Sequence, residues 1–230
     1  CFSEEVVVPA ERVIPIRKDM PFTQAALVGC CVTTGVGAVV RHAKVEPGAT
    51  MLVIGCGGVG LNVVQGGRLS GAGRIIACDV LDNKLDMARK FGATDVINST
   101  RDNVAETVRA IVGGPGVDYA FDSVAIDKTL AVAVDAIAPG GRVVSVGVPA
   151  LTMQASFAPF GLVLQEKTIS GTFYGSSRPL IDFPTLVDHS MNGRLNIADL
   201  ISRTYRLDQI NEGFDAMMSG DVARGVVVFD

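Results

Sequence analysis

The stretch from Met51 to Asp79 constrains the fold of this chain more than any other. It reads MLVIGCGGVGLNVVQGGRLSGAGRIIACD. A short apolar segment runs into Gly55–Gly60, whose glycines have the spacing G-x-G-x-x-G, and a helix-length segment follows. A second apolar segment then ends at Asp79. Strand, glycine-rich turn, helix, strand and acid in this order are typical of a βαβ unit that binds a dinucleotide.

Each part of the turn has its own physical reason. Gly55 permits the tight turn, Gly57 lets the backbone approach a pyrophosphate, and Gly60 lets the helix pack closely on the strand. The N–H groups at the helix start, from Gly58 onwards, have no partners within the helix. With the helix dipole behind them they attract an anion. The alternative interpretation is a purely structural turn between a strand and a helix.

Asp79 indicates which dinucleotide is bound. It lies 19 residues past Gly60, where a carboxylate can accept hydrogen bonds from the adenosine ribose hydroxyls. The same carboxylate repels a 2′-phosphate, and no arginine occurs in residues 80–83 to bind one. The sequence therefore predicts NAD rather than NADP. The alternative role for Asp79 is that of a helix-capping residue.

The composition and the order of apolar segments predict an α/β fold. Hydrophobic residues make up 48% of the 230 residues and tryptophan is absent, as expected for the aliphatic core of a parallel sheet covered on both faces. The alternation predicts a Rossmann-type, doubly wound, six-stranded parallel sheet with right-handed crossovers. The expected strands are Met51–Ile54, Arg74–Asp79, Asp95–Ile97, Val117–Phe121, Arg142–Val146 and Lys167–Thr172.

Three segments are predicted along the chain: 1–31, a nucleotide-binding domain at 32–175, and 176–230. The last is too short to form a core alone. The first should hold short strands at Val6–Val8 and Val13–Ile16, and the last should close with a strand at Gly225–Phe229. Helices are expected near Thr23–Val28, Thr34–Lys44, Asn83–Phe91, Val104–Val112, Lys128–Ile137, Pro184–Asn192 and Gln209–Met218.

Charge and hydropathy exclude two classes of partner. A net charge of −4 and a pI near 5.2 argue against nucleic acid. The uncharged stretches Met20–Val40 and Val143–Gln165 are interrupted by proline, glycine and glutamine, which favours buried segments of a soluble protein over membrane spans. No signal peptide is visible, although the chain begins at Cys1 rather than at methionine.

The five cysteines predict reduced thiols. Their number is odd, no C-x-x-C pattern occurs, and Cys56 and Cys78 are assigned to apolar strands. The expected location is therefore cytoplasmic.

Six groups of residues accompany the glycine-rich turn in a fixed order. They are Gly29-Cys30, Thr33-Thr34-Gly35-Val36-Gly37-Ala38, Asp79 with Lys84, Val146-Gly147-Val148-Pro149, Ile210-Asn211-Glu212-Gly213-Phe214 and Arg224-Gly225-Val226. Together they resemble the zinc-containing medium-chain alcohol dehydrogenases. The branch nearest in pattern contains glutathione-dependent formaldehyde dehydrogenase and its bacterial, class III-like relatives. The resemblance covers nearly the whole chain.

The resemblance implies roles for individual residues. Cys30 matches a ligand of the catalytic zinc, and Thr34 matches a threonine beside the nicotinamide. Val59 packs near the coenzyme, Lys84 reaches the adenosine ribose, and Arg224 pairs with the pyrophosphate. Without the resemblance, Cys30 would be interpreted as a small core residue, Lys84 as a surface lysine and Arg224 as a rim arginine.

The resemblance also implies a nicotinamide pocket. Val124, Val146 and Val148 match residues along it, where backbone groups hold the carboxamide. All three valines are core residues in either interpretation. His42 and His189 match no functional position and are taken as structural or surface residues.

One departure from the family pattern is large. The family's catalytic zinc takes a further cysteine and a histidine from an N-terminal lobe that this sequence does not contain, and one thiolate cannot hold a catalytic zinc. The resemblance therefore implies a coenzyme-binding portion at 32–175. The segments 1–31 and 176–230 would be remnants of a GroES-like catalytic domain. We expect the fragment alone to be inactive.

The intact enzyme implied by the resemblance transfers a hydride between NAD and an alcohol or an S-hydroxymethyl thiol adduct. Zinc lowers the pKa of the alcohol in that reaction. The implied partners are a small-molecule alcohol and further copies of the chain, in a homodimer or homotetramer that pairs through Lys167–Thr172. Two alternatives stay open: a non-catalytic NAD-binding module, and a zinc-free quinone reductase, against which Asp79 and Cys30 both count.

Overall fold

A computed structural model describes residues 2–220 and 222–229, so Cys1 lies outside the described residues. The chain divides into two compact units. One is the central unit Thr34–Ser177, and the other joins Cys1–Thr33 to Arg178–Asp230. The assignment of 1–31 and 176–230 to remnants of a catalytic domain stays a prediction.

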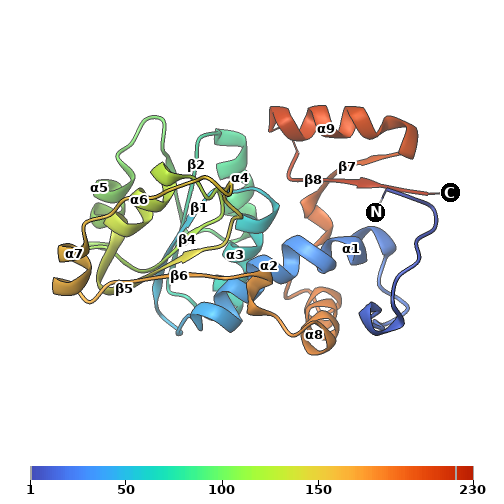
Figure 1. The fold of residues 1–230 in the computed structure, drawn as a ribbon, viewed down its shortest axis with the longest axis horizontal. Helices are drawn as coiled ribbons and strands as arrows, with labels where there is room; N and C mark the ends of the chain where they lie inside the picture. Colours follow the sequence, from blue (N-terminus) through green and yellow to red (C-terminus); the bar gives the residue numbers. More distant parts are fainter. Residues whose placement is uncertain (1, 221, 230) are drawn as a thin grey trace. The chain divides into compact units, whose positions relative to one another are not determined.

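The central unit is built on a single parallel sheet (Figure 1). Its strand order is β3-β2-β1-β4-β5-β6, and every neighbouring pair is parallel. This is the doubly wound order in which two βαβαβ halves start from adjacent central strands, so the predicted fold class is confirmed. The strands are β1 (Thr50–Ile54), β2 (Arg74–Asp79), β3 (Asp95–Asn98), β4 (Val117–Asp122), β5 (Ile137–Ser145) and β6 (Thr168–Gly171).

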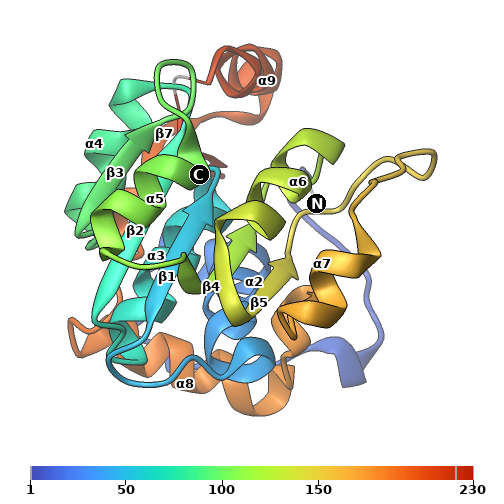
Figure 2. The ribbon, with the colours of Figure 1, turned by 90° about the vertical axis from the view of Figure 1, so that its left-hand side faces the viewer.

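Helices cover both faces of this sheet. Helices α3 (Gly58–Leu69) and α4 (Asp82–Phe91) pack on one face. Helices α5 (Val104–Val112) and α6 (Asp127–Ala136) pack on the other, in front of the strands in Figure 2. Because both faces are covered, the central strands are apolar along almost their whole length.

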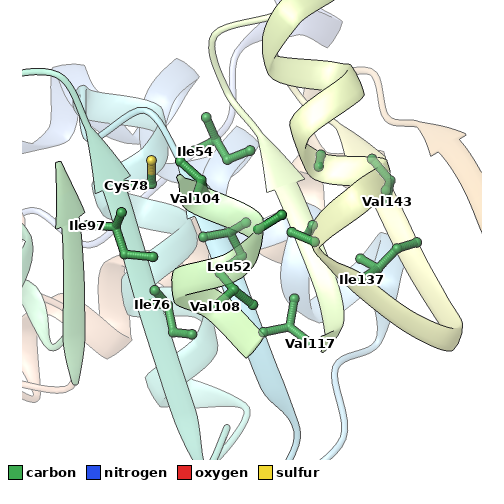
Figure 3. Packing of buried hydrophobic residues seen from close by; sticks show 14 residues of the cluster. Leu52, Ile54, Ile76, Cys78, Ile97, Val104, Val108, Val117, Ile137 and Val143 are labelled. Carbon is green, nitrogen blue, oxygen red and sulfur yellow. The ribbon is translucent and has the colours of Figure 1, made fainter. Parts of the chain in front are cut away.

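The core beneath α5 and α6 is aliphatic (Figure 3). Leu52 and Ile54 of β1 and Ile76 of β2 point towards Val104 and Val108 of α5, and all five side chains are at most 7% exposed. Each such side chain contributes about 1.5–3 kcal/mol when it is fully buried. A shift of one residue in β1 would exchange the side chains of its two faces, so this packing fixes the register.

The other unit holds the segments that flank the central unit in the sequence. Its two-stranded sheet pairs β7 with β8 in parallel, and α9 packs on β8. The expected closing strand and last helix are present, and the helix expected at Pro184 begins five residues earlier at Pro179. The elements are α1 (Phe22–Leu27), η2 (Val28–Val32), α8 (Pro179–Met191), β7 (Ile201–Tyr205), α9 (Ile210–Ser219) and β8 (Arg224–Val227).

Two expected strands are wrong. Neither Val6–Val8 nor Val13–Ile16 forms a strand, and the short 3₁₀ turn η1 (Ala10–Arg12) separates them. Val7 is fully exposed. A strand needs the N–H and C=O groups of a neighbouring strand, and the described residues of this unit provide none beside these segments. A valine-rich, alternating sequence is therefore not sufficient by itself to form a strand.

One helix among the described residues, Phe22–Ala43, is long and apolar enough to cross a membrane by length and composition. Buried core helices pass the same test, and 61% of its most apolar window is buried. The helix runs on through α2 (Thr33–Gly37) and η3 (Ala38–Ala43) and ends at Lys44, whose φ is 53°.

His42 links η3 to the far edge of the sheet within the central unit. Its Nε2 lies 3.1 Å from Ser170 Oγ on β6, and its Nδ1 lies 3.0 Å from Ser176 Oγ. Ser170 donates its own proton to the Val143 carbonyl, so Nε2–H donates to Ser170 and Nδ1 accepts from Ser176. Burial and the positive charge of Arg142 lower the pKa of His42 below 6.5. The network therefore favours neutral imidazole.

We predict that this network makes folding pH-sensitive. Because the pKa of His42 is lower in the folded than in the unfolded chain, the unfolded chain takes up the proton first as the pH falls below about 6.5. Stability is then complete above this pH and decreases below it. Thermal unfolding of the wild type and of His42→Asn between pH 5 and 8 checks this. An equal loss of stability in both proteins below pH 6.5 would show that His42 is not responsible.

Candidate coenzyme-binding site

The glycine-rich turn lies where the strand order reverses. The first half of the sheet extends from β1 towards β3, and the second half extends from β4 towards β6. Loops leave the carboxyl ends of β1 and β4 in opposite directions and open a crevice between them, which is where ligands bind in this class of sheet. Residues 55–60 follow β1 and residues 123–126 follow β4, so both segments border this crevice.

The backbone of the turn allows no side chain at two of its glycines. Gly55 has a φ of 88°, and a Cβ on Gly60 would lie 1.7 Å from the carbonyl oxygen of Gly55. A Cβ on Gly57, by contrast, would meet no atom within 4 Å. Gly55 and Gly60 are thus required for the chain to fold in this way, whereas Gly57 leaves open space above the backbone. That space suits a diphosphate.

Helix α3 begins at this open space. Its N-cap is Gly57, which has no side chain to accept a hydrogen bond, and the first turn starts with Gly58 and Val59. N–H groups in the first turn of a helix have no intrahelical acceptors and carry the positive end of the helix dipole. They can hold an anion without any charged side chain.

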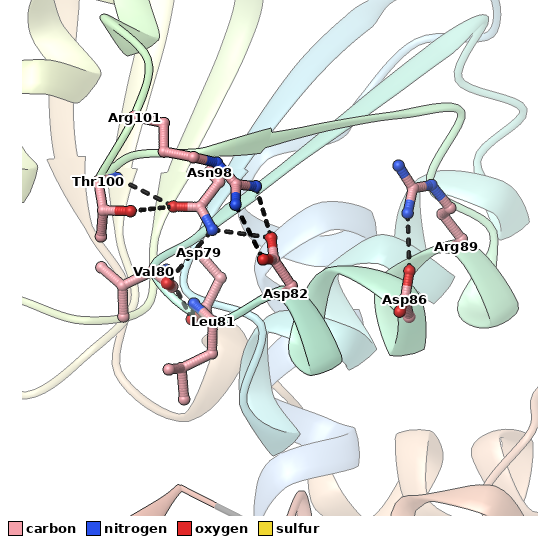
Figure 4. Close-up of polar contacts among 9 residues, drawn as sticks. All are labelled: Asp79, Val80, Leu81, Asp82, Asp86, Arg89, Asn98, Thr100 and Arg101. Atoms are coloured by element: carbon pink, nitrogen blue, oxygen red, sulfur yellow. Dashed lines mark hydrogen bonds and ion pairs between the residues drawn. The ribbon is translucent and has the colours of Figure 1, made fainter.

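Asp79 closes the turn from the end of β2 (Figure 4). Its Oδ2 accepts a hydrogen bond from Cys56 N at 2.7 Å. Its Oδ1 accepts from Val80 N at 2.8 Å and from Leu81 N at 3.1 Å, just before α4 begins. A carboxylate has about four acceptor positions, so Asp79 can orient this loop and still accept from a sugar hydroxyl. The N-cap of α4 is Leu81, and no side chain caps that helix. Asp79 therefore orients the loop before α4 and is not the helix cap given as its alternative role.

The sequence argument missed an ionic network beside Asp79. Arg101, from the loop after β3, donates to both oxygens of Asp82 at 2.6 and 2.9 Å and lowers the pKa of that carboxyl (Figure 4). The buried amide of Asn98 donates to Asp82 at 2.8 Å. Arg101 lies well beyond residues 80–83, the positions that directly follow Asp79. Its charge is balanced by Asp82, which leaves the prediction of NAD over NADP unchanged.

Lys84 and the cysteines also lie close to the turn. Lys84 is half-buried on the first turn of α4, and its charge opposes the rise in the pKa of the Cys56 thiol that burial causes. Cys78 is on β2, but Cys56 lies in the turn and not on a strand, which corrects the sequence assignment. Burial raises the pKa of Cys78 to about 12. Both are free thiols, as are Cys30 and Cys31.

The loop after β4 is organised by a residue that sequence reasoning missed. Asp122 is buried, and its Oδ1 accepts hydrogen bonds from Val124 N at 3.0 Å and from Ala125 N at 3.1 Å. Ser123 Oγ lies 2.9 Å from Ile54 O and 3.0 Å from Gly55 O, so it joins this loop to the glycine-rich turn. The one available signal was a polar residue ending an apolar strand.

The other predicted pocket residues follow β5 or precede α3. Val146 is buried, and its N–H donates to the Asp122 carbonyl at 2.8 Å. Val148 is 86% exposed and Val124 is 45% exposed, so the prediction that these two valines are core residues is wrong. Thr34 is half-buried on α2. The next residue, Gly35, packs so closely on α3 that a Cβ would lie 2.5 Å from Val59 O.

Two predicted residues belong to the other unit. Cys30 is exposed on η2, and Arg224 begins β8 with its guanidinium beside the buried Cys31 thiol. Their predicted roles towards zinc and pyrophosphate stay predictions. Among the described residues no group of three or more histidine, cysteine or acidic side chains could hold a metal ion. A catalytic zinc needs three protein ligands, so the described residues do not fit one by themselves.

A cavity of about 490 Å³ lies at the opposite edge of the sheet. Asp135 of α6, Phe157 and Lys167 line it, near the amino ends of β5 and β6. Lys167 Nζ donates to the carbonyl of Val134 at 2.9 Å, and Arg109 donates to Asp135. These contacts cap the carboxyl end of α6. The cavity shares no residue with the glycine-rich turn.

Comparison with known proteins identifies the family of the chain. Residues 58–191 match the family model described as zinc-binding dehydrogenase. S-(hydroxymethyl)glutathione dehydrogenase of Paracoccus denitrificans is 40% identical over 99% of this chain and 62% of its own length. Alcohol dehydrogenase-like 5 of Arabidopsis thaliana is 37% identical over 98% of this chain and 59% of its own length.

A solved structure has the same fold. Benzyl alcohol dehydrogenase from Acinetobacter calcoaceticus superimposes with a TM-score of 0.91 at 31% identity, over 94% of this chain and 59% of that one. The chain thus spans about 60% of the length of the relatives it matches.

The glycines of the turn yield a matched pair of variants. Gly60→Ala should destabilise the chain by about 2 kcal/mol or more, because the new methyl group collides with Gly55 O. Gly57→Ala should leave stability within about 0.5 kcal/mol, because its methyl group meets nothing, yet weaken nucleotide binding by filling the open space. Chemical denaturation and calorimetry measure the two effects. Equal stability of the two variants would contradict the packing argument.

Proposed function

Because this chain belongs to the zinc-binding dehydrogenase family, we propose that it is the coenzyme-binding part of an NAD-dependent alcohol dehydrogenase. The observation that carries the proposal is the open space above the backbone of Gly57, which lies where the strand order of the sheet reverses. Asp79 borders the same turn through its hydrogen bond with Cys56 N. The space, the uncapped N–H groups of α3 and a carboxylate with spare acceptor capacity match a diphosphate joined to a ribose.

Different residues would bind different parts of the coenzyme. The first turn of α3, from Gly58, would hold the pyrophosphate, and Asp79 with Lys84 would hold the adenosine ribose. Thr34, Val59 and the segments at Val124 and 146–148 would enclose the nicotinamide end. The coenzyme supplies a carbon that accepts or returns hydride. The protein contributes orientation and exclusion of water from that carbon.

The substrate class is proposed from the relatives. Their names specify S-(hydroxymethyl)glutathione and benzyl alcohol, which supports an alcohol or an S-hydroxymethyl thiol adduct for the intact protein. Zinc is proposed for the intact protein only, with Cys30 as one ligand and the others from outside this sequence. No catalytic step through zinc follows from the described residues, because they do not form a site for it.

Assembly and location are proposed as well. Strand β6 is one of the two edge strands of the sheet and is half-exposed. Pairing of β6 with its copy would extend the sheet across a two-fold axis, which supports a homodimer or a tetramer built from such dimers. A cytoplasmic location is supported by the free thiols of the described cysteines.

A second candidate function is a non-catalytic NAD-binding module. The exposed Cys30 and the absence of a metal-holding cluster among the described residues favour it for this chain taken alone. Both candidates require NAD binding, and they differ in whether a longer protein that contains the sequence oxidises an alcohol. An alcohol oxidation assay on that longer protein separates them.

We expect the 230-residue chain to bind NAD without oxidising alcohols. Isothermal titration calorimetry should show saturable binding of NAD. With zinc added to the buffer the protein should still produce no NADH from primary alcohols, because one cysteine cannot hold a catalytic zinc. Gly57→Ala serves as the control for specific binding. Natively folded protein that shows no saturation at millimolar NAD would refute the proposal.

Replacement of Asp79 should change coenzyme preference. Asp79→Ser removes the charge that repels a 2′-phosphate, so we expect the ratio of Kd for NADP to Kd for NAD to fall at least about tenfold, or about 1.4 kcal/mol. Asp79→Asn also removes the charge and keeps an acceptor for the Val80 and Leu81 N–H groups, although it loses the acceptor for Cys56 N. An unchanged ratio in both folded variants would show that Asp79 does not select the coenzyme.

A further inference from the structure

Asp122 carries a buried charge at the carboxyl end of β4, with a relative exposure of 1%. A buried carboxylate is costly unless hydrogen-bond donors surround it. Three donors do so here. The N–H groups of Val124 and Ala125 donate to Oδ1, and the Thr129 hydroxyl lies 2.9 Å from Oδ2. The carboxylate therefore fixes the β4–α6 loop to the first turn of α6.

The loop that it fixes has an unfavourable backbone conformation. Ala125 has a φ of 62°, in the left-handed region that residues with a Cβ rarely adopt. The two N–H bonds to Oδ1 of Asp122 span this residue and its neighbour Val124, and they compensate for that conformation. Without the carboxylate, the loop would lose the interactions that hold Val124 beside the crevice.

The main chain of the same residue holds a second segment. The carbonyl oxygen of Asp122 accepts hydrogen bonds from Val146 N at 2.8 Å and from Gly147 N at 3.1 Å. Its side chain thus positions the loop after β4, and its carbonyl positions the segment after β5. Cys56, Val80 and Leu81, which bind Asp79 at the adenosine end, make none of these contacts.

We propose that Asp122 is the positioning residue for the nicotinamide end of the coenzyme. It sets the relative places of Val124 and Val146 and, being buried, acts through them without touching the coenzyme itself. The proposal rests on the function proposed above, which assigns these two valines to the nicotinamide. It follows that loss of the carboxylate weakens the binding of the nicotinamide end selectively, while the adenosine end binds as before.

The test compares two ligands on the full 230-residue chain. NAD and ADP-ribose share the adenosine diphosphate and the second ribose, but only NAD carries nicotinamide. In Asp122→Asn we expect the Kd for NAD to rise about tenfold and the Kd for ADP-ribose to change less than about twofold, since tenfold corresponds to one charge-assisted hydrogen bond. Thr129→Val removes one of the three donors to Asp122, together with the acceptor of the Ile126 N–H. In this variant we expect the Kd for NAD to rise about threefold and the Kd for ADP-ribose to stay unchanged.

The matched control is Asp118→Asn. Asp118 lies near the opposite end of the same strand, where its carboxylate accepts hydrogen bonds from the backbone N–H and the hydroxyl of Thr50, each at 2.8 Å. It makes a similar number of local contacts far from the crevice. We expect both dissociation constants to remain at their wild-type values.

Two outcomes would overturn this role of Asp122 while leaving the proposed coenzyme-binding function in place. One is an equal loss of affinity for both ligands in natively folded Asp122→Asn and Thr129→Val, which would make Asp122 a support of the whole site. The other is an unchanged affinity for NAD. Should Asp122→Asn fail to fold, Thr129→Val alone decides between these results. A wild-type chain that binds neither ligand refutes the coenzyme-binding function itself, and this proposal with it.

Discussion

The contact between the carbonyl of Gly55 and the backbone of Gly60 governs the rest of the site. A Cβ on Gly60 would lie 1.7 Å from that oxygen, so α3 can start this close to the end of β1 only because both residues are glycines. The close approach directs the first N–H groups of α3 into the crevice. The pairing of β1 with β4 brings Ser123 within reach of Ile54 O and Gly55 O, which joins the two halves of the sheet beside this contact.

Two carboxylates then make the edges of the crevice rigid. Asp79 at the end of β2 and Asp122 at the end of β4 each accept hydrogen bonds from backbone N–H groups of the loops that follow them. One lies at the end assigned to the adenosine and the other at the end assigned to the nicotinamide. Each oxygen that accepts from the backbone reduces loop freedom before a ligand arrives, which lowers the entropic cost of binding.

The sequence was sufficient to predict the central strands of the sheet and the glycine-rich turn between β1 and α3. Strands β1 and β2 are apolar runs that are buried along most of their length, and the turn at residues 55–60 has a spacing that few other structures require. Asp122 could not be found in this way, because its role arises from loops that meet only after folding. The strand predicted at Val6–Val8 is absent, because a strand also needs a neighbouring strand to pair with. The five-residue β7 is present but was not predicted, because it is short and polar.

The central claim is that a dinucleotide lies on the first turn of α3. Amide chemical shifts measured by NMR during a titration with NAD test it most directly. The account predicts that the largest saturating changes occur at the N–H groups of residues 57–60, with smaller changes at Cys56 and Val80, whose amides bind Asp79. Saturating changes confined to the cavity lined by Asp135 and Lys167, with the turn unaffected, would contradict it.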